Sequence, residues 1–308
     1  MLAPSFTTRS LRALVLICLS LACACNAGRP ARENATGSRE ITDDAGRRVS
    51  LPERVERVIS LAPNLTEIVF AVGGGDRLVG NTTYCDYPAE AKTIAKVGDS
   101  LQPSLERIIA LRPQVVLIST ASQLEVFTQQ LHNQNIAVFV TDPQDLDGIF
   151  RTIEQVGQIL GQSEQANQLV KKLRERTSAV EQAVKNAKPV RVFYQVSGEP
   201  LYTLGKDAYL TDLIRRAGGV SVTADVPGAW PRYSNESALA AKPEAIILPT
   251  GGSMGAANSS VTDALRNSPA VLAGRVYKIN DDYLARPGPR LVDGLEAMAH
   301  ALHPEAFF

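Results

Sequence analysis

Apolar residues along the chain follow two alternating patterns. Short runs of consecutive apolar residues are typical of buried strands, and apolar residues recurring every three or four positions are typical of helices. In the first half these patterns predict strands at 57–61, 78–80, 115–118 and 136–140, with helices at 66–72, 104–112 and 122–134. Because strands and helices alternate, we expect a mostly parallel sheet with helices on its faces.

The same plan returns in the second half after two helical stretches at 142–160 and 163–187. Strands are predicted at 190–196, 245–248 and 276–279, and a strand and turn at 202–206. Helices are predicted at 210–217, 234–242, 261–267 and 289–302. The alternation predicts two α/β lobes, residues 39–142 and 161–308, joined by a connecting helix over residues 143–160.

Two segments repeat one another without a gap, SLERIIALRPQVVLI at 104–118 and SNESALAAKPEAIIL at 234–248. In each, a serine suits the helix N-cap, a proline ends the helix, and an apolar strand follows. Glu106 and Glu236 occupy the same place in the first turn, where a carboxylate suits the helix dipole. Two like units with two like acidic positions suggest two lobes that meet a symmetric partner.

The N-terminus carries an apolar run of ten residues, which is too short to span a bilayer. Arginines before the run and small residues after it are typical of an export signal, here residues 1–25. The run ends in Ala-Cys-Ala-Cys, so we expect lipidation at Cys23 or Cys25, with cleavage after Ala27 as a third option. Residues 26–38 are polar and aperiodic, which predicts a flexible tether. The protein is therefore expected in the periplasm or on the outer face of the cytoplasmic membrane, anchored by lipid.

Composition narrows the possible partners. The 308 residues hold 32 Lys and Arg against 32 Asp and Glu with no basic block, which argues against nucleic acid and anionic membrane surfaces. His132, His300 and His303 are scattered, too few for a metal site. Cys85 is the one cysteine beyond the leader, so no internal disulfide is available and a buried apolar role is expected.

Several segments together resemble a known family, over about residues 54–303: RVISLAPNLTEIVFAVG, VGNTTYCDYP, SLERIIALRPQVVLI, GAWPRYSNESALAAKPEAII and LARPGPRL. They resemble the substrate-binding proteins of cobalamin, haem and siderophore ABC importers. The resemblance implies two Rossmann-like α/β lobes with mostly parallel sheets, joined by a single long rigid helix. It also implies a monomer without enzymatic activity that docks on a dimeric permease with ATPase subunits. Glu106 and Glu236 would meet permease arginines.

The resemblance further implies a cobalamin-like corrinoid as the ligand and no other cofactor. Haem and a ferric siderophore are the alternatives. A large flat amphipathic ligand needs aromatic faces for its ring and a few polar groups for its edge. By the resemblance, the ligand-binding residues are Tyr84, Tyr202, Trp230, Asp282 and Arg286. The chain departs from the family pattern where Ser100 and Ser119 replace two pocket tryptophans, which leaves the ligand open.

One stretch points to a different class of protein. Residues 251–255 read G-G-S-M-G, which fits the G-x-S-x-G nucleophile elbow of α/β-hydrolases, with Ser253 as the nucleophile. Asp281 or Asp293 and His300 follow in the required order. An elbow needs a helix directly after its serine, whereas small and polar residues predict a loop here. We therefore expect no hydrolase activity.

Overall fold

The computed structural model describes residues 37–119, 125–251 and 260–307, and two four-stranded parallel sheets form its framework. The first sheet contains β3 (Val58–Ser60), β4 (Leu78–Asn81), β5 (Val115–Ser119) and β6 (Ala137–Thr141). The second contains β7 (Val190–Tyr194), β10 (Gly219–Ser221), β11 (Ala245–Thr250) and β12 (Val276–Asn280). The predicted α/β class with mostly parallel sheets is confirmed.

Both sheets share one topology. The strand orders are β4-β3-β5-β6 and β10-β7-β11-β12, so in each sheet the first strand lies inside and its successor lies on one side. The chain then crosses back to the other side. In open parallel sheets, ligands bind beyond the carboxyl ends of the strands at the point where this order reverses. By this rule, the loops that follow β3, β5, β7 and β11 are candidates for ligand binding.

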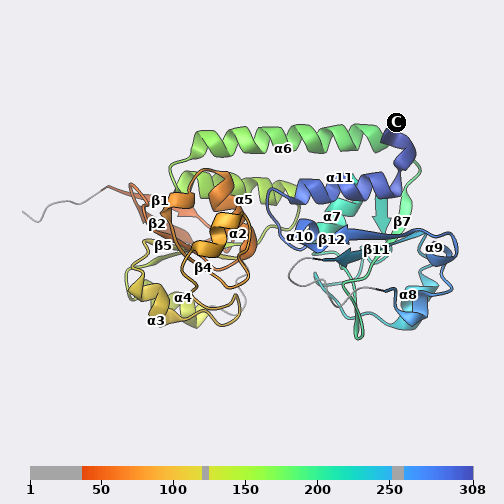
Figure 1. Ribbon diagram of the computed structural model, residues 1–308, viewed down its shortest axis with the longest axis horizontal. Helices are drawn as coiled ribbons and strands as arrows, with labels where there is room; N and C mark the ends of the chain where they lie inside the picture. Colours follow the sequence, from red (N-terminus) through yellow and green to blue (C-terminus); the bar gives the residue numbers. More distant parts are fainter. Residues whose placement is uncertain (1–36, 120–124, 252–259, 308) are drawn as a thin grey trace, which may run out of the picture. The chain divides into compact units, whose positions relative to one another are not determined.

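The helices cover the faces of these sheets (Figure 1). In the N-terminal half they are α2 (Pro63–Ala71), α3 (Leu105–Ala110) and α4 (Glu125–His132). In the C-terminal half they are α7 (Tyr209–Arg216), α8 (Asn235–Ala240), α9 (Pro269–Leu272), α10 (Asp281–Leu284) and α11 (Leu291–Leu302). Two small hairpins complete the strands: β1 (Ser38–Thr42) with β2 (Arg48–Pro52), and β8 (Ser197–Gly198) with β9 (Leu201–Tyr202). Short 3₁₀ turns lie at Gly75–Arg77, Ala89–Thr93, Asp263–Leu265 and Pro304–Phe307.

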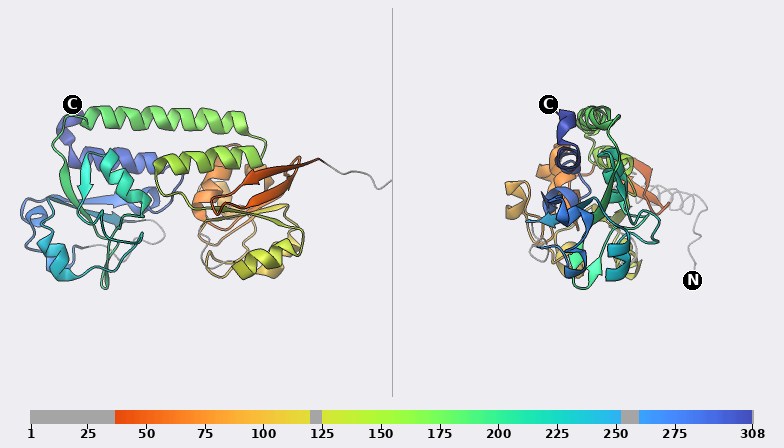
Figure 2. Two further views of the ribbon diagram at one scale, coloured as in Figure 1. Left: turned by 180° about the vertical axis from the view of Figure 1, so that it is seen from behind. Right: turned by 90° about the vertical axis from the view of Figure 1, so that its right-hand side faces the viewer.

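Two long helices lie between the sheets in the sequence. α5 (Leu146–Ile159) falls within the predicted connecting segment, and α6 (Ser163–Val184) follows after a turn. α6 packs along α5 and then along α11, as Figures 1 and 2 show. A Cβ on Gly157 would lie 2.3 Å from the Cβ of Ala166, so only glycine permits this close approach of α5 and α6.

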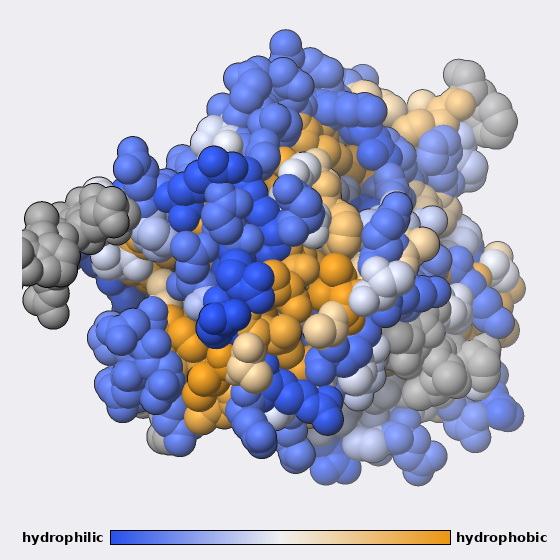
Figure 3. Space-filling view, turned by 60° about the vertical axis from the view of Figure 1, so that its left-hand side comes forward, coloured by the Kyte–Doolittle hydropathy of each residue, from blue (hydrophilic) through white to orange (hydrophobic). Residues whose placement is uncertain are grey.

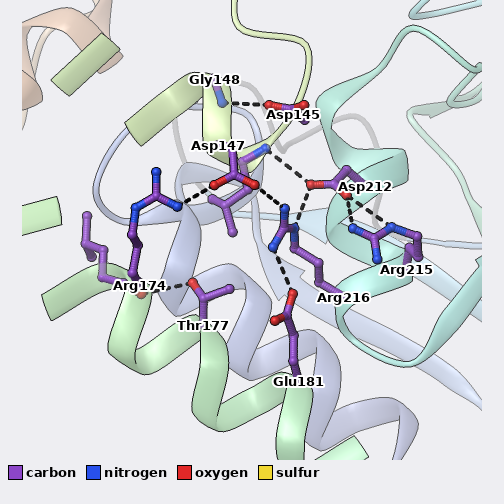
Figure 4. A network of polar contacts seen from close by, with 11 residues as sticks. Asp145, Asp147, Gly148, Arg174, Thr177, Glu181, Asp212, Arg215 and Arg216 are labelled. Atoms are coloured by element: carbon purple, nitrogen blue, oxygen red, sulfur yellow. Dashed lines mark hydrogen bonds and ion pairs between the residues drawn. The ribbon is translucent and has the colours of Figure 1, made fainter. Parts of the chain in front are cut away.

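The N-terminal end of α5 is bonded to the C-terminal half of the chain (Figure 4). Arg216 of α7 contacts Asp147 of α5 at 2.6 Å, Asp212 of α7 at 2.7 Å and Glu181 of α6 at 2.8 Å. Asp212 also accepts the free backbone N–H of Leu146. The other end of α5 is bonded to the N-terminal half, where Arg39 donates to the carbonyl of Ile159. α5 thus bonds to both halves of the chain.

Three apolar clusters form the core. The largest runs through both halves and includes the inward faces of both sheets together with α2, α5, α6, α7 and α11. The second packs on the opposite face of the first sheet, and the third on the opposite face of the second sheet. Each sheet is therefore buried on both faces, which explains why its strands are apolar runs rather than alternating ones.

Hydrophilic residues cover most of the surface in Figure 3, including its upper part, where α6 lies. α6 buries one stripe of apolar residues and exposes its lysines, glutamines and glutamates. Hydrophobic residues reach the surface below it in a smaller area. Among the described residues, no helix combines the length and the apolar character that crossing a membrane requires.

One predicted helix is displaced along the chain. The helix expected at 261–267 is a 3₁₀ turn at Asp263–Leu265, and the helix itself is α9. Proline favours the first helical position, so Pro269 starts α9, with the Ser268 hydroxyl as its cap. In the stretch where a strand and turn are expected, 202–206, the strand β9 ends at Tyr202 and a turn begins at Lys206. The pattern also missed β10, because Gly218 and Gly219 read only as a helix stop.

Candidate functional site

Loops from the two halves meet at a group of charged side chains, which we call the arginine–carboxylate cluster. Its members are Glu67 of α2, Asp86 in the loop after β4, Asp282 of α10, and Arg286 and Arg290 just after α10. Arg286 Nη1 donates to Glu67 Oε1 at 3.0 Å and to Asp86 Oδ1 at 2.8 Å. Arg286 Nη2 lies 2.9 Å from Asp282 Oδ1. One guanidinium thus joins the two halves of the chain.

Glu67 is the most buried member of the cluster. Its side chain is 3% exposed and accepts from Arg286 and, through both oxygens, from Arg290 Nε at 2.9 Å and Nη2 at 2.6 Å. A buried carboxylate is tolerated only when it is paired and hydrogen-bonded, and Glu67 has two cationic partners. The Asn64 side chain donates to the Pro287 carbonyl at 3.2 Å, which adds a second bond between α2 and this loop.

The ion pairs of the cluster explain how the pKa values of Arg286 and Asp86 are shifted. Burial lowers the pKa of Arg286, but hydrogen bonds to Asp86 and Glu67 outweigh it, so the net pKa is raised. Burial raises the pKa of Asp86, but the Arg286 hydrogen bond and charge bring it below its usual range. For Asp281, burial and the nearby Asp282 carboxylate raise the pKa. Arg286 and Asp86 are therefore fully charged at neutral pH.

Exposed aromatic side chains lie around the cluster. Trp230 is 44% exposed, and Tyr84 and Tyr87 are each 47% exposed, which is unusual for large apolar side chains. The Tyr87 ring covers the Arg290 guanidinium with 4.0 Å between the guanidinium carbon and the ring centroid. Tyr84 is two residues from Asp86 in the same loop. Exposed aromatic faces beside buried charge are a common form of small-molecule site.

Trp230 is linked to the cluster through the buried Tyr209. The Trp230 ring packs edge-on against Tyr209, with centroids 6.1 Å apart and planes at 78°. The Tyr209 hydroxyl donates to the carbonyl of Leu284 at 2.8 Å, two residues before Arg286. Burial and the charge of Asp281 raise the pKa of Tyr209, which stays a hydrogen-bond donor at neutral pH.

Tyr202 lies on β9 beside the segment that carries Trp230. The backbone of Tyr202 forms an isolated bridge with Arg232, and the next amide, Thr203 N, donates to the carbonyl of Pro231 at 3.2 Å. A Cβ on Gly205 would lie 2.0 Å from the carbonyl oxygen of Gly228, so glycine is needed for the Trp230 segment to lie this close. Tyr202 itself is half-buried.

The structure brings two of the five predicted ligand residues into direct contact and links the other three to them through intervening residues. Asp282 and Arg286 are in contact, Tyr84 joins them through its loop, and Trp230 and Tyr202 join through Tyr209 and β9. The region also contains three residues that the sequence did not indicate, Glu67, Asp86 and Arg290. A signal for Glu67 existed, since it is a lone acid among the apolar positions of its helix.

Glu106 and Glu236 lie outside this region, each exposed in the first turn of a short helix. The Ser104 hydroxyl caps α3 by accepting from Arg107 N at 3.3 Å, and the Ser234 hydroxyl caps α8 by accepting from Ser237 N at 3.0 Å. Glu236 also borders a surface cavity of about 910 Å³. The repeat holds each carboxylate in the same local setting.

The two repeat units also share a backbone conformation and an arginine hydrogen bond. Directly after the C-cap of each helix comes a residue with positive φ, Arg112 at 47° and Lys242 at 45°. Arg57, directly before β3, donates to the carbonyl of the α3 C-cap Leu111 at 2.6 Å. Arg191, the second residue of β7, donates to the carbonyl of the α8 C-cap Ala241 at 2.7 Å. The predicted repeat is therefore a structural repeat.

The hydrolase residues are otherwise engaged or lie outside the described residues. Ser253 is outside them. Asp293 Oδ1 accepts a hydrogen bond from Arg176 Nη2 at 2.6 Å. The His300 ring stacks on Phe307, with ring centroids 3.9 Å apart. Asp293 and His300 are seven residues apart on α11, about 10 Å along its axis, too far for a hydrogen bond.

Metal-ligating groups and cysteines are the remaining candidates for a reactive site. Within residues 37–119, 125–251 and 260–307, no group of three His, Cys, Asp or Glu side chains is placed to hold a metal ion. Cys85 is a buried free thiol 3.1 Å from the Thr82 hydroxyl, as expected for a small core residue. Cys23 and Cys25 lie outside the described residues.

Comparison with known proteins gives consistent matches. Residues 58–283 match the periplasmic binding protein family. The uncharacterized ABC transporter substrate-binding lipoprotein YvrC of Bacillus subtilis (strain 168) is 31% identical over 310 residues, 96% of each chain.

Two solved structures are also similar. The periplasmic vitamin B12 binding protein BtuF of Vibrio cholerae has a TM-score of 0.73 and 28% identity, covering 82% of this chain and 99% of that one. The periplasmic haem-binding protein BhuT in complex with two haems has a TM-score of 0.70 and 26% identity, covering 80% of this chain and 98% of that one.

Proposed function

The chain belongs to the periplasmic binding protein family, and we propose that it is the substrate-binding component of an ABC importer. In this proposal it captures one cobalamin-like corrinoid and delivers it to a dimeric permease with ATPase subunits. The observation that supports a flat ring as ligand is the set of exposed aromatic side chains around the arginine–carboxylate cluster. Tyr84 and Tyr87 lie in the loop that follows β4, and Trp230 lies in the segment between β10 and α8. Binding residues concentrate in such loops.

The ligand residues take distinct roles in this proposal. Trp230, Tyr84 and Tyr202 would pack against the ring, because each presents an aromatic face in or beside a loop. Asp282 and Arg286 would serve the polar edge of the ligand, Asp282 by direct contact and Arg286, which is 5% exposed, as the partner that holds Asp282 in place. A corrinoid is favoured by the similarity to the vitamin B12 binding protein, and haem is the second candidate because a haem-binding protein is nearly as similar. A ferric siderophore is the third.

The N-terminal leader would determine where the protein is located. Export and a lipid anchor at Cys23 or Cys25 would hold the protein on the outer face of the cytoplasmic membrane, and the relative YvrC is a lipoprotein. Mass spectrometry of the mature N-terminus tests the anchor. A diacylated or triacylated cysteine supports it, and an unmodified chain that starts near Gly28 contradicts it.

Ligand binding is tested with the purified protein. Each candidate ligand is incubated with the protein, excess ligand is removed by desalting, and the absorption spectrum shows which one remains bound. For the retained ligand, Trp230→Ala is expected to weaken binding about tenfold to a hundredfold, because a large stacked aromatic is removed. Leu272→Ala is the control, since Leu272 is also an exposed apolar residue, 76% exposed, but lies on α9. Equal affinity in wild type and Trp230→Ala for every ligand would contradict the site.

A further inference from the structure

The members of the arginine–carboxylate cluster differ in how far they are exposed. The side chains of Glu67, Arg286 and Arg290 are 3%, 5% and 14% exposed. Asp282 and Asp86 are 21% and 43% exposed. The two cations therefore lie inside the cluster, and the charged atoms that meet solvent are mainly the oxygens of the two aspartates.

The arginines of the cluster already have anionic partners. Arg286 contacts Glu67, Asp86 and Asp282. Arg290 donates two charge-assisted hydrogen bonds to Glu67. Three carboxylates against two guanidiniums leave the cluster with one net negative charge. The positive charge is compensated within the protein, so a ligand carboxylate would gain little from it.

Building on the proposed function, we propose that this site selects a ligand whose polar edge consists of neutral amides and rejects ligands with free carboxylates. Asp86 is the specificity-determining residue. Amide N–H groups of the ligand donate to the exposed oxygens of Asp86 and Asp282. A ligand carboxylate in the same place is repelled by the negative charge of the aspartates and has no N–H to donate to them. Its binding is therefore weaker than that of the amide.

The position of Asp86 explains why it has this role. It is the most exposed acid of the cluster, and it lies two residues from Tyr84, which is proposed to contact the ring. The Arg286 hydrogen bond keeps the pKa of Asp86 low, so its charge is present at neutral pH. Lys92 is exposed and its charge acts on Asp86 in the same direction, so it offsets part of the negative charge at low salt.

Two corrinoids that differ only at the edge test this selection. The first is cyanocobalamin. The second is the same molecule with its free side-chain amides hydrolysed to carboxylates. Binding of each to the wild-type protein is measured by calorimetry at one fixed salt concentration. We expect the carboxylate form to bind at least about a hundredfold more weakly. The ratio of the two dissociation constants is the readout.

Asp86→Asn removes the charge but keeps an acceptor for Arg286, and it is expected to shrink this ratio about tenfold. Asp263→Asn is the matched control. It makes the same change in net charge on a side chain that is 83% exposed and paired with Arg266, so its ratio should equal that of the wild type.

A wild-type protein that binds the carboxylate form as tightly as cyanocobalamin would overturn the selection while leaving corrinoid binding intact. An equal change of the ratio in Asp86→Asn and Asp263→Asn would overturn the local role of Asp86. A wild-type protein that binds neither corrinoid would instead refute the proposed function itself, and the selection with it.

Discussion

Arg216 provides a direct test of how α5 is fixed to the C-terminal half (Figure 4). The perturbation is Arg216→Met, which keeps the length of the side chain and removes its charge. The arginine is 14% exposed, and its partner Asp212 is 16% exposed, so both charges are largely removed from water. The substitution leaves Asp212 with the exposed Arg215 as its remaining cationic partner.

The size of the effect lies between two known limits. Exposed ion pairs contribute about 0–1 kcal/mol, and removing one partner of a fully buried pair costs about 3–5 kcal/mol. Asp147 and Glu181 are each 38% exposed, so their contacts with Arg216 are discounted toward the lower limit. We expect a loss of about 2–3 kcal/mol, which Asp212 dominates.

Denaturation by urea, followed by circular dichroism, measures this loss. Arg215→Met is the matched control, because Arg215 pairs with the same Asp212 at 2.5 Å but is 65% exposed, and it should cost under about 1 kcal/mol. A double-mutant cycle with Asp212→Asn isolates the pair itself. Equal destabilisation by Arg216→Met and Arg215→Met would refute the reasoning.

The pH dependence adds a second readout. Burial raises the pKa of Asp212, but hydrogen bonds from Arg216 and Arg215 outweigh it, and the net pKa is lowered from its usual 3.8. A carboxyl with a lowered folded-state pKa contributes stability above its unfolded pKa and loses it as the pH falls through its folded pKa. The difference between wild type and Arg216→Met should therefore be constant above about pH 5 and shrink in stronger acid.

Two further predictions concern packing and the support of Trp230. Gly157→Ala should destabilise the protein by about 1–3 kcal/mol in the same urea assay, because the new Cβ would overlap that of Ala166. No loss would show that α5 and α6 can move apart freely. Tyr209→Phe should cost about 1–3 kcal/mol and weaken ligand binding, since it leaves the Leu284 carbonyl without its donor. Unchanged stability and affinity would show that Tyr209 supports neither.

The sequence predicted those features that depend on neighbours along the chain. Apolar runs marked the buried parallel strands, and serine, proline and acidic positions marked α3 and α8. The arginine–carboxylate cluster was not predictable in this way, because Arg286 lies 219 residues from Glu67 and 200 from Asp86. The sequence indicated Arg286 as a polar contact for the ligand but gave no sign that other acids already surround it. Pairing over such a separation is decided by the topology of both sheets.

The two repeated glutamates give the last prediction, which concerns delivery rather than capture. Glu106 and Glu236 are exposed in the first turns of equivalent helices, and neither takes part in an ion pair described in this structure. Neither should therefore matter for the melting temperature or for ligand affinity. We propose that each forms a charge-assisted, bidentate hydrogen bond with a permease arginine, one contact from each half of the chain.

Both contacts must form together on a two-fold symmetric permease. Ligand uptake with the double variant should therefore be reduced by more than the product of the two single reductions. Glu106→Ala and Glu236→Ala are each expected to weaken uptake at limiting protein concentration, and the double variant to abolish it. Glu164→Ala is the control, since Glu164 is also exposed in the first turn of a helix, α6, but lies outside the repeat. If the double variant transported ligand at the wild-type rate, the shared geometry of α3 and α8 would reflect duplication of the fold, and docking would have to use another surface.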